Sequence, residues 1–267
     1  MIKKSGLEMH EYEAGILRTD FRCEKSCIID LSCKAIAREA LPGQFVQVRV
    51  GSGTDPFLRR TFSLCGTDPA RGEIRLLVDI VGRGTELLCS MKRGMNVNII
   101  GSLGTGFDMK LGGTGTCVLV AGGSGAAPLI FLANRLITST KRPVVFIMGA
   151  KSSVYLSVIE GLKSDGIIVK TATDDGSAGF CGPVSELLDK QIEDIKPDAL
   201  YTCGPHAMMK AVSHLAEKYS IPCQISLEER MACGVGACLG CAAPLRDGRM
   251  VRTCVDGPVF HASEVAW

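Results

Sequence analysis

Hydrophobic and polar residues alternate in short runs over the first hundred residues of the chain. The clearest runs are residues 45–50, 73–81 and 96–100, and glycine, proline and aspartate residues separate them. A period of two, broken by turn-forming residues, is typical of short antiparallel strands. One helix is expected at residues 85–91. This part of the chain therefore predicts an antiparallel β-barrel or β-sandwich.

The pattern changes between about residues 115 and 224, where continuous apolar runs alternate with amphipathic segments. Strands are expected at residues 117–121, 143–150, 166–172 and 198–203, and helices at 128–139 and 206–218. Strands that alternate with helices along the chain build a parallel, doubly wound sheet. The fold class predicted is thus mixed β and α/β.

The last stretch of the chain is rich in cysteine and glycine and is too short for a hydrophobic core of its own. A metal centre would have to hold it together. The sequence therefore predicts three domains: a barrel at residues 1–110, an α/β domain at 111–224 and a small metal-cluster domain at 225–267.

Composition narrows the functional classes. Hydrophobic residues make up 46% of the chain and charged residues 22%, which fits a globular protein with a substantial core. A net charge of +2 gives no reason to expect nucleic acid or an anionic membrane as a partner. Lys3 and Lys4 are not followed by the apolar run of a signal peptide, and no run approaches the ~20 residues that cross a bilayer. The expectation is a soluble, cytoplasmic protein.

Cysteine is the most unusual feature of the composition. The chain has thirteen cysteines, an odd number, of which four are bunched near the C-terminus. Scattered thiols together with one bunch indicate a reducing compartment and a metal site rather than a framework of disulfides. The scattered cysteines are Cys23, Cys27, Cys33, Cys65, Cys89, Cys117, Cys181, Cys203 and Cys223.

The four bunched cysteines, Cys233, Cys238, Cys241 and Cys254, have the spacing C-x4-C-x2-C-x12-C. The first three match the plant-ferredoxin spacing for a 2Fe–2S cluster, in which two thiolates bind each iron. Glycines between them let the loop fold tightly around the cluster. A structural zinc site is the alternative, although such sites usually have two C-x2-C pairs, whereas this sequence has one. Unliganded thiols are a further alternative.

A glycine-rich turn follows the first strand of the α/β segment. Such a turn lets a pyrophosphate approach the backbone at the start of the next helix. The motif departs from G-x-G-x-x-G because a proline occupies its last position, so a tight turn without a ligand stays an alternative. Its candidate residues are Gly122, Gly123, Ser124, Gly125 and Pro128.

Other candidates follow strands or lie within them. The segment from Cys203 through Gly204 to Pro205 ends a strand at the sheet edge where ligands of α/β folds bind, although a lone buried cysteine is by default inert packing. Asp174 also follows a strand, in a segment that would serve equally well as an Asp–Gly turn. Arg60 can neutralise a phosphate, or it can simply lie on a solvated edge strand.

These motifs, taken together and in order, resemble the ferredoxin–NADP reductase superfamily. The sequence Arg60-Thr61-Phe62-Ser63 resembles its flavin motif, and residues 123–128 and 203–205 resemble its pyridine-nucleotide motifs. Residues 231–241 and 254–260 are similar to those of one branch, the electron-transfer subunits of dihydroorotate dehydrogenase B. The resemblance covers essentially the whole chain.

The resemblance implies an FAD-binding barrel of six strands, an NAD-binding domain and a 2Fe–2S tail. It implies the following roles: Arg60 at the FAD pyrophosphate, Thr61, Phe62 and Ser63 at the flavin ring, Leu77, Val78 and Asp79 on the adenosine side, Gly84 and Thr85 at phosphate, and Cys203 near the nicotinamide as the catalytic candidate. Thr61 departs from the branch, where many members carry proline. FAD is still expected, because that contact would be made by the backbone.

The implied activity needs a partner. A separate FMN subunit would oxidise dihydroorotate in pyrimidine biosynthesis, and electrons would pass from FMN through 2Fe–2S and FAD to NAD⁺, in a heterotetramer. Lys151, after the second strand of the α/β segment, could favour a 2′-phosphate, but the family points to NAD. Two alternatives stay open: the reductase subunit of a hydrogenase or sulfide dehydrogenase, and a zinc-stabilised nucleotide-sensing module.

Overall fold

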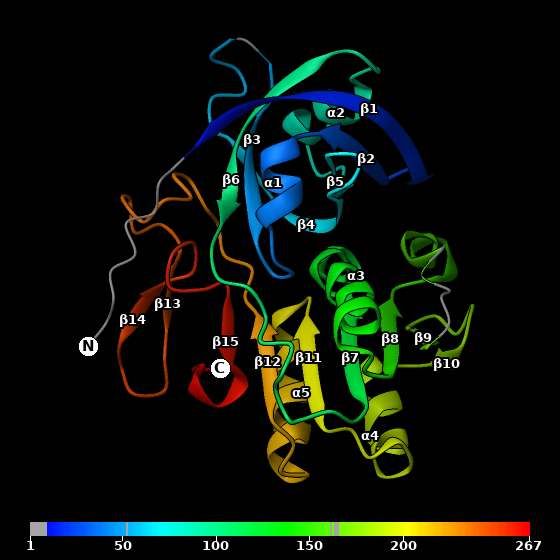
Figure 1. Cartoon of the computed structure of the whole chain (residues 1–267). Helices are drawn as coiled ribbons and strands as arrows, with labels where there is room; N and C mark the ends of the chain where they lie inside the picture. The colour runs from blue at the N-terminus through cyan, green and yellow to red at the C-terminus, as the bar shows by residue number, and fades with distance from the viewer. Residues whose placement is uncertain (1–9, 52, 161, 163–165) are drawn as a thin grey trace.

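The computed structural model describes residues 10–51, 53–160, 162 and 166–267. Lys3 and Lys4 lie outside the described residues. A β-barrel formed by the N-terminal part of the chain lies against one layer of an α/β unit, and the C-terminal tail runs along the side of both (Figure 1). This arrangement confirms the mixed β and α/β fold class.

Six antiparallel strands form the closed barrel, in the order β1-β2-β5-β4-β3-β6. The strands are β1 Glu11–Cys23, β2 Ser26–Ser32, β3 Phe45–Arg49, β4 Arg60–Asp68, β5 Glu73–Asp79 and β6 Asn96–Leu103. Pairing of β1 with β6 closes the ring, so the barrel rather than the sandwich is confirmed. Helix α1 spans Lys34–Glu39 and α2 spans Arg83–Ser90, the latter two residues earlier at its start than the sequence predicted.

Alternation along the strands sorts side chains between the barrel interior and its outer surface. On β3, Val46 and Val48 lie in the interior cluster, whereas Phe45 packs outside the barrel with residues of the C-terminal tail. The interior also holds Cys27 and Cys89, which form a disulfide between β2 and α2. The sequence pattern does not predict this disulfide, because no local motif indicates contact between residues 62 positions apart.

A seven-stranded sheet forms the second unit, in the order β10-β9-β8-β7-β11-β12-β15. The strands are β7 Cys117–Gly122, β8 Val144–Ala150, β9 Ile167–Thr173, β10 Phe180–Cys181, β11 Ala199–Cys203, β12 Cys223–Ser226 and β15 Val259–His261. All neighbours pair in parallel except β12 and β15. The predicted doubly wound parallel sheet is therefore present, with one antiparallel edge strand added.

Helices cover both faces of this sheet. Helix α3, Ala126–Arg135, lies between the sheet and the barrel, whereas α4, Val184–Ile195, and α5, His206–Lys218, pack together on the other face (Figure 1). The predicted helix 128–139 was misplaced at both ends. It begins earlier because proline is tolerated within a first helical turn. Beyond Arg135 the chain continues as a π-helical turn, Leu136–Thr140.

The C-terminal tail is not separate from the α/β unit. It contains a small hairpin, β13 Ala242–Pro244 with β14 Met250–Arg252, and then supplies β15 to the large sheet. The predicted domain boundary at residues 224/225 falls inside β12. The three-domain division stays a prediction. Within the described ranges, no helix is long and apolar enough to cross a membrane.

Candidate functional site

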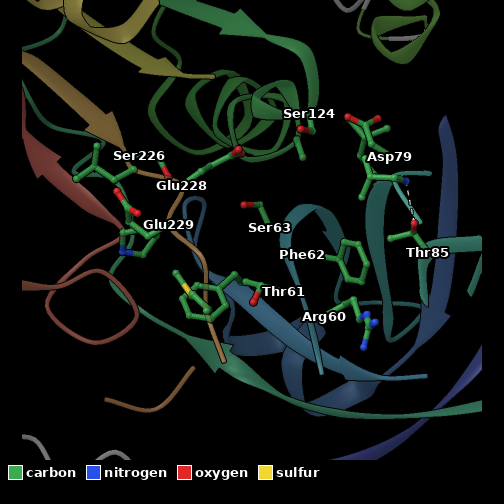
Figure 2. A pocket seen from close by; sticks show the side chains of 17 residues that line it. Arg60, Thr61, Phe62, Ser63, Asp79, Thr85, Ser124, Ser226, Glu228 and Glu229 are labelled. Carbon is green, nitrogen blue, oxygen red and sulfur yellow. Dashed lines mark hydrogen bonds between the residues drawn. The ribbon is translucent and has the colours of Figure 1, made fainter. Parts of the chain in front are cut away.

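A pocket of about 330 Å³ lies between the barrel and the chain that leaves β12. Figure 2 shows Arg60, Asp79 and Thr85 toward one end of it, and Ser226, Glu228 and Glu229 toward the other. The lining includes eight residues that the sequence proposed for cofactor binding: Arg60, Thr61, Phe62, Ser63, Leu77, Asp79, Thr85 and Ser124. We call this cavity the flavin pocket.

Arg60 and the start of α2 form the polar end of the flavin pocket. A Cβ atom added to Gly84 would lie only 2.8 Å from Arg60 Nη2, so the guanidinium rests directly over the first turn of the helix. The first N–H groups of a helix have no partner within it and favour anions. A guanidinium above these N–H groups suits a pyrophosphate on two counts, charge and hydrogen-bond donors.

Thr85 supports this turn through its own hydroxyl. Its Oγ1 accepts hydrogen bonds from the backbone N–H groups of Val81 (2.9 Å) and Gly82 (3.2 Å), and donates to the carbonyl of Gly82 (2.8 Å). Thr85 therefore orders the loop that precedes α2. Its predicted role at a phosphate group stays a prediction. Thr85 would act on the phosphate indirectly, by holding this loop in place.

Residues 77–79 on β5 alternate between pocket and core, as strand geometry requires. Leu77 and Asp79 line the flavin pocket, whereas the side chain of Val78 is fully buried in the barrel interior. Only the backbone of Val78 can face a ligand, so its predicted contact on the adenosine side cannot come from its side chain.

A second pocket of about 610 Å³ opens at the carboxyl edge of the large sheet. Gly122 and Gly123 of the glycine turn line it, with Asp174 and Pro205. We call it the nucleotide pocket. Asp79 lines both pockets, so the two cavities are adjacent.

Close packing explains two glycines of this turn. A Cβ atom on Gly122 would lie 2.8 Å from the Pro205 ring, and one on Gly125 would lie 2.6 Å from the backbone nitrogen of Gly204. Gly125, Pro128 and Gly204 do not line either pocket. Gly125 and Gly204 allow the close approach of β7, the start of α3 and the end of β11, and Pro128 is buried within α3. Their predicted contact with a cofactor stays untested, and their packing role is evident.

Lysine side chains contribute positive charge to the nucleotide pocket from two directions. Lys151 follows β8, and Lys25 comes from the turn between β1 and β2 of the barrel. The end of β1, just before that turn, is anchored to the α/β unit, since Ser157 Oγ donates to the carbonyl of Arg22 (2.8 Å). No sequence pattern predicts a role for Lys25, because only the tertiary fold brings the barrel over the sheet edge.

Cys203, the predicted catalytic residue, is fully buried and lines neither pocket. Burial, and then the nearby carboxylate of Glu228, raise the pKa of the Cys203 thiol well above its usual range. The thiol therefore stays protonated, and its Sγ lies 3.9 Å from Glu228 Oε1. Ser226 and Glu228 both hydrogen-bond the Cys203 thiol and both line the flavin pocket, so Cys203 meets this pocket through these two residues.

Asp79 lies where the two pockets meet, and its surroundings shift the pKa of its carboxyl group. Partial burial raises the pKa of its carboxyl above the usual value, although a hydrogen bond from Ser124 opposes the shift. As pH rises past the ordinary value of 3.8, the unfolded chain ionises first and the folded chain loses relative stability. An Asp79→Asn variant should therefore gain stability relative to the native chain as pH rises, and keep that gain above the raised pKa.

Urea unfolding of the cofactor-free protein across this pH range checks the prediction. Asp189→Asn is a control of opposite sign, because Lys218 lowers the pKa of Asp189 and its carboxylate stabilises the fold at higher pH. A relative stability of Asp79→Asn that falls with rising pH would contradict the assignment.

The four clustered cysteines lie close together in the tail, three in residues 233–241 and the fourth at Cys254 after β14; we call residues 233–241 with Cys254 the cysteine loop. Backbone N–H groups point at their sulfurs: Val235 and Cys238 donate to Cys233 Sγ (3.5 and 3.4 Å), and Gly236 donates to Cys254 Sγ (3.2 Å). Burial opposes ionisation of Cys233, but these amide hydrogen bonds prevail and lower its pKa to about 6. The amides thus favour an anionic sulfur at Cys233, whereas burial and the neighbouring Cys241 raise the pKa of Cys254.

The sulfurs are arranged as two pairs. The side chains of Cys233 and Cys238 are hydrogen-bonded to each other, and so are those of Cys241 and Cys254. Nowhere in the described ranges do three His, Cys, Asp or Glu side chains converge as ligands of one metal ion. Two pairs fit a cluster with two thiolates on each iron, whereas zinc needs four ligands around one point. The residues present therefore fit 2Fe–2S better than zinc.

The cysteine loop packs against the outer wall of the barrel. Cys241 and Cys254 are each only 2% exposed and form a small core with Phe45 and Leu103, against which Met231 packs. Phe45 and Met231 also line the flavin pocket. The same two side chains therefore touch both sites.

Sequence reasoning missed several pocket residues. The flavin pocket is also lined by the last residue of β12 and the segment that follows it: Ser226, Leu227, Glu228, Glu229 and Met231. A usable signal existed, because Glu228 and Glu229 come two and three residues after a buried strand, at the ligand-binding edge of the sheet. No motif marks them.

Comparison with known proteins identifies the family. Residues 119–214 match the oxidoreductase NAD-binding domain, and residues 228–266 match the iron-sulfur cluster binding domain of dihydroorotate dehydrogenase B. The dihydroorotate dehydrogenase B (NAD(+)) electron transfer subunit of Desulforamulus reducens is 39% identical over 96% of this chain and 98% of its own length. The chain belongs to this family.

The family assignment confirms the resemblance inferred from the sequence. The electron transfer subunit from Bacillus caldolyticus, of the same family, is 38% identical over 91% of this chain and 93% of its own length. Among solved structures, an NADH-dependent reduced ferredoxin-NADP oxidoreductase superposes with a TM-score of 0.86 at 29% identity, over 95% of this chain and 90% of that one. A ferredoxin NADP+ reductase from Neisseria gonorrhoeae, with a TM-score of 0.63 at 19% identity over 78% of this chain and 91% of that one, shares the fold.

Proposed function

We propose that this electron transfer subunit binds FAD in the flavin pocket, NAD in the nucleotide pocket and a 2Fe–2S cluster in the cysteine loop. It passes electrons from an FMN-containing dihydroorotate dehydrogenase subunit to NAD⁺. One observation carries the proposal: the three sites are contiguous. Asp79 lines both pockets, and Phe45 and Met231 line the flavin pocket while packing at the cysteine loop.

The residues of the flavin pocket divide the work of holding FAD. Arg60 and the first turn of α2 bind its pyrophosphate, and Thr61, Phe62 and Ser63 line the ring. Leu77 and Asp79 face the cavity from β5. When bound, FAD supplies the exchange between hydride transfer and single-electron transfer, which a nicotinamide and an iron–sulfur cluster cannot make directly.

The nucleotide pocket holds NAD by its glycine turn and by lysines. Gly122 and Gly123 let a pyrophosphate approach the backbone, and Lys25 and Lys151 offer it positive charge. Asp174 and Pro205 lie at the same sheet edge. We assign NAD rather than NADP because both relatives described above carry NAD(+) in their names.

The cysteine loop provides four thiolates and the amides that stabilise them. Cys233 with Cys238 and Cys241 with Cys254 are the proposed ligand pairs. Cys238 is exposed, and it places one edge of the loop at the molecular surface. A partner subunit can approach the cluster at that edge.

The partner and location follow from the same assignment. Both pockets are taken by nucleotides, so oxidation of dihydroorotate in pyrimidine biosynthesis falls to the FMN subunit. We propose that the two subunits assemble as a heterotetramer in the cytoplasm. Seven cysteines lie outside both the Cys27–Cys89 disulfide and the proposed ligand set and are free thiols, which suits a reducing compartment.

A second candidate is a reductase subunit of another complex, such as a hydrogenase or sulfide dehydrogenase. The close superposition on the NADH-dependent reduced ferredoxin-NADP oxidoreductase supports this second candidate. The FAD, NAD and cluster sites would serve either complex, so only the substrate-oxidising partner distinguishes them.

Co-expression with the FMN subunit encoded by the same organism tests the proposal. The purified complex should show flavin and iron–sulfur absorbance and should reduce NAD⁺ when dihydroorotate is added. A complex that contains the cofactors but is inactive with dihydroorotate would favour the second candidate. A colourless protein that contains zinc would overturn both.

A further inference from the structure

Gln47 is a buried polar residue on the outer surface of the barrel. It lies on β3 between Val46 and Val48, which face the barrel interior, so its own side chain faces outward. An outward glutamine on a barrel strand is ordinarily solvated, yet this one is 0% exposed. The cysteine loop covers it.

The contacts of Gln47 reach both proposed redox sites. Its Nε2 donates a 2.8 Å hydrogen bond to Thr61 Oγ1, on the neighbouring strand β4 and in the lining of the flavin pocket. On its other side it packs against Gly234, the residue after Cys233. A Cβ atom on Gly234 would lie 2.7 Å from Gln47 Cγ and 2.8 Å from Cδ. Gly234 also has φ +69°, which disfavours any other residue there.

The amide oxygen of Gln47 is the second polar atom of this side chain. Gln47 Oε1 is buried and has no hydrogen-bond partner among the described residues. Buried acceptors without donors are costly and therefore rare. The hydrogen bond to Thr61 Oγ1 therefore satisfies only the donor side of this buried amide.

We propose that Gln47 is a positioning residue that joins the flavin strand to the cluster loop. The inference rests on the proposed function, since it needs FAD and the cluster at their assigned sites. Through Thr61, Gln47 fixes the strand that lines the flavin ring, and through Gly234 it fixes the loop next to the first cluster ligand. A substitution at Thr61 therefore alters the cluster, and a change at Gly234 alters the flavin.

Reductive titration of the loaded subunit tests the proposal, with the cluster followed by EPR and the flavin by visible absorbance. Thr61→Val removes the acceptor on the flavin side but leaves the cluster loop intact. It should nevertheless shift the cluster's EPR g-values and reduction potential. Gln47→Leu should shift the potentials of both centres, and the double variant should shift them no further than Gln47→Leu does, because one interaction is lost in all three.

Two controls sharpen the result. Thr61→Ser keeps the hydroxyl and should restore the native EPR spectrum. Gln224→Leu makes the same change at another buried glutamine, which accepts from the backbone of Asp108 (2.9 Å), and should leave both potentials unchanged. An unshifted cluster in Thr61→Val, or fully additive shifts in the double variant, would overturn the proposal. If Gln47→Leu fails to fold, the Thr61→Val and Thr61→Ser pair still decides. A native chain that binds no FAD or cluster would instead overturn the proposed function.

Discussion

A Cys238→Ser variant is expected to lose dihydroorotate-driven NAD⁺ reduction while it keeps NADH-driven reduction of an artificial two-electron acceptor. Cys238 is a proposed cluster ligand, and its side chain lies at the exposed edge of the cysteine loop. Replacing it removes one thiolate and leaves the packing of Cys241 and Cys254 against the barrel intact. The pockets assigned to FAD and NAD do not include the loop cysteines, so activity that needs only those two should survive.

EPR of the reduced variant should show a lost or severely weakened cluster signal, and both activities should be assayed on the same preparation. Cys181→Ser is the matched control, because Cys181 is also exposed but lies on the edge strand β10, outside the cysteine loop. Loss of metal can unfold a small cysteine-rich segment. Gel filtration must therefore show the complex intact. An intact, cluster-free complex that still couples the two reactions at near-normal rate would mean that electrons take another route.

Arg60→Ala is expected to weaken FAD binding by about one to two orders of magnitude. The guanidinium lies over the first turn of α2, where the pyrophosphate is proposed to bind. A hydrogen bond to a charged group contributes about 1.5–3 kcal/mol, and each ~1.4 kcal/mol changes affinity about tenfold. The truncated side chain also gives up the donors that suit a pyrophosphate.

Fluorescence titration of the apoprotein with FAD measures this effect directly. Arg71→Ala is the control, since Arg71 is an exposed arginine whose ion pair with Glu73 (2.8 Å) lies away from the pocket. The control should bind FAD as the native chain does. Equal FAD affinity in Arg60→Ala and Arg71→Ala would remove Arg60 from the binding site.

Much of the fold could be predicted from local pattern. The helix at residues 206–218 was predicted at its observed bounds, and the strand at 117–121 was one residue short of β7, because period and flanking turns mark such elements strongly. The end of α3 was missed, since its apolar pattern continues into the π-helical turn at Leu136–Thr140. Strand β15 was not predicted either, because three residues are too few to show an alternating pattern and no turn joins them to a neighbouring strand in the sequence.

The sequence by itself determined the chemistry of the chain: a cysteine spacing for an iron–sulfur cluster, a glycine turn for a pyrophosphate and a flavin motif. Each of these lies in one short segment, so local spacing suffices to identify it. Only the tertiary structure decided which side chains complete the sites. Lys25 reaches the nucleotide pocket from the barrel, and Glu228 faces the flavin pocket beside the buried thiol of Cys203. Gln47 touches both a flavin-pocket residue and the cysteine loop. These residues meet their partners across sequence separations that no periodicity or motif encodes, because packing of the barrel, sheet and tail against one another brings them together.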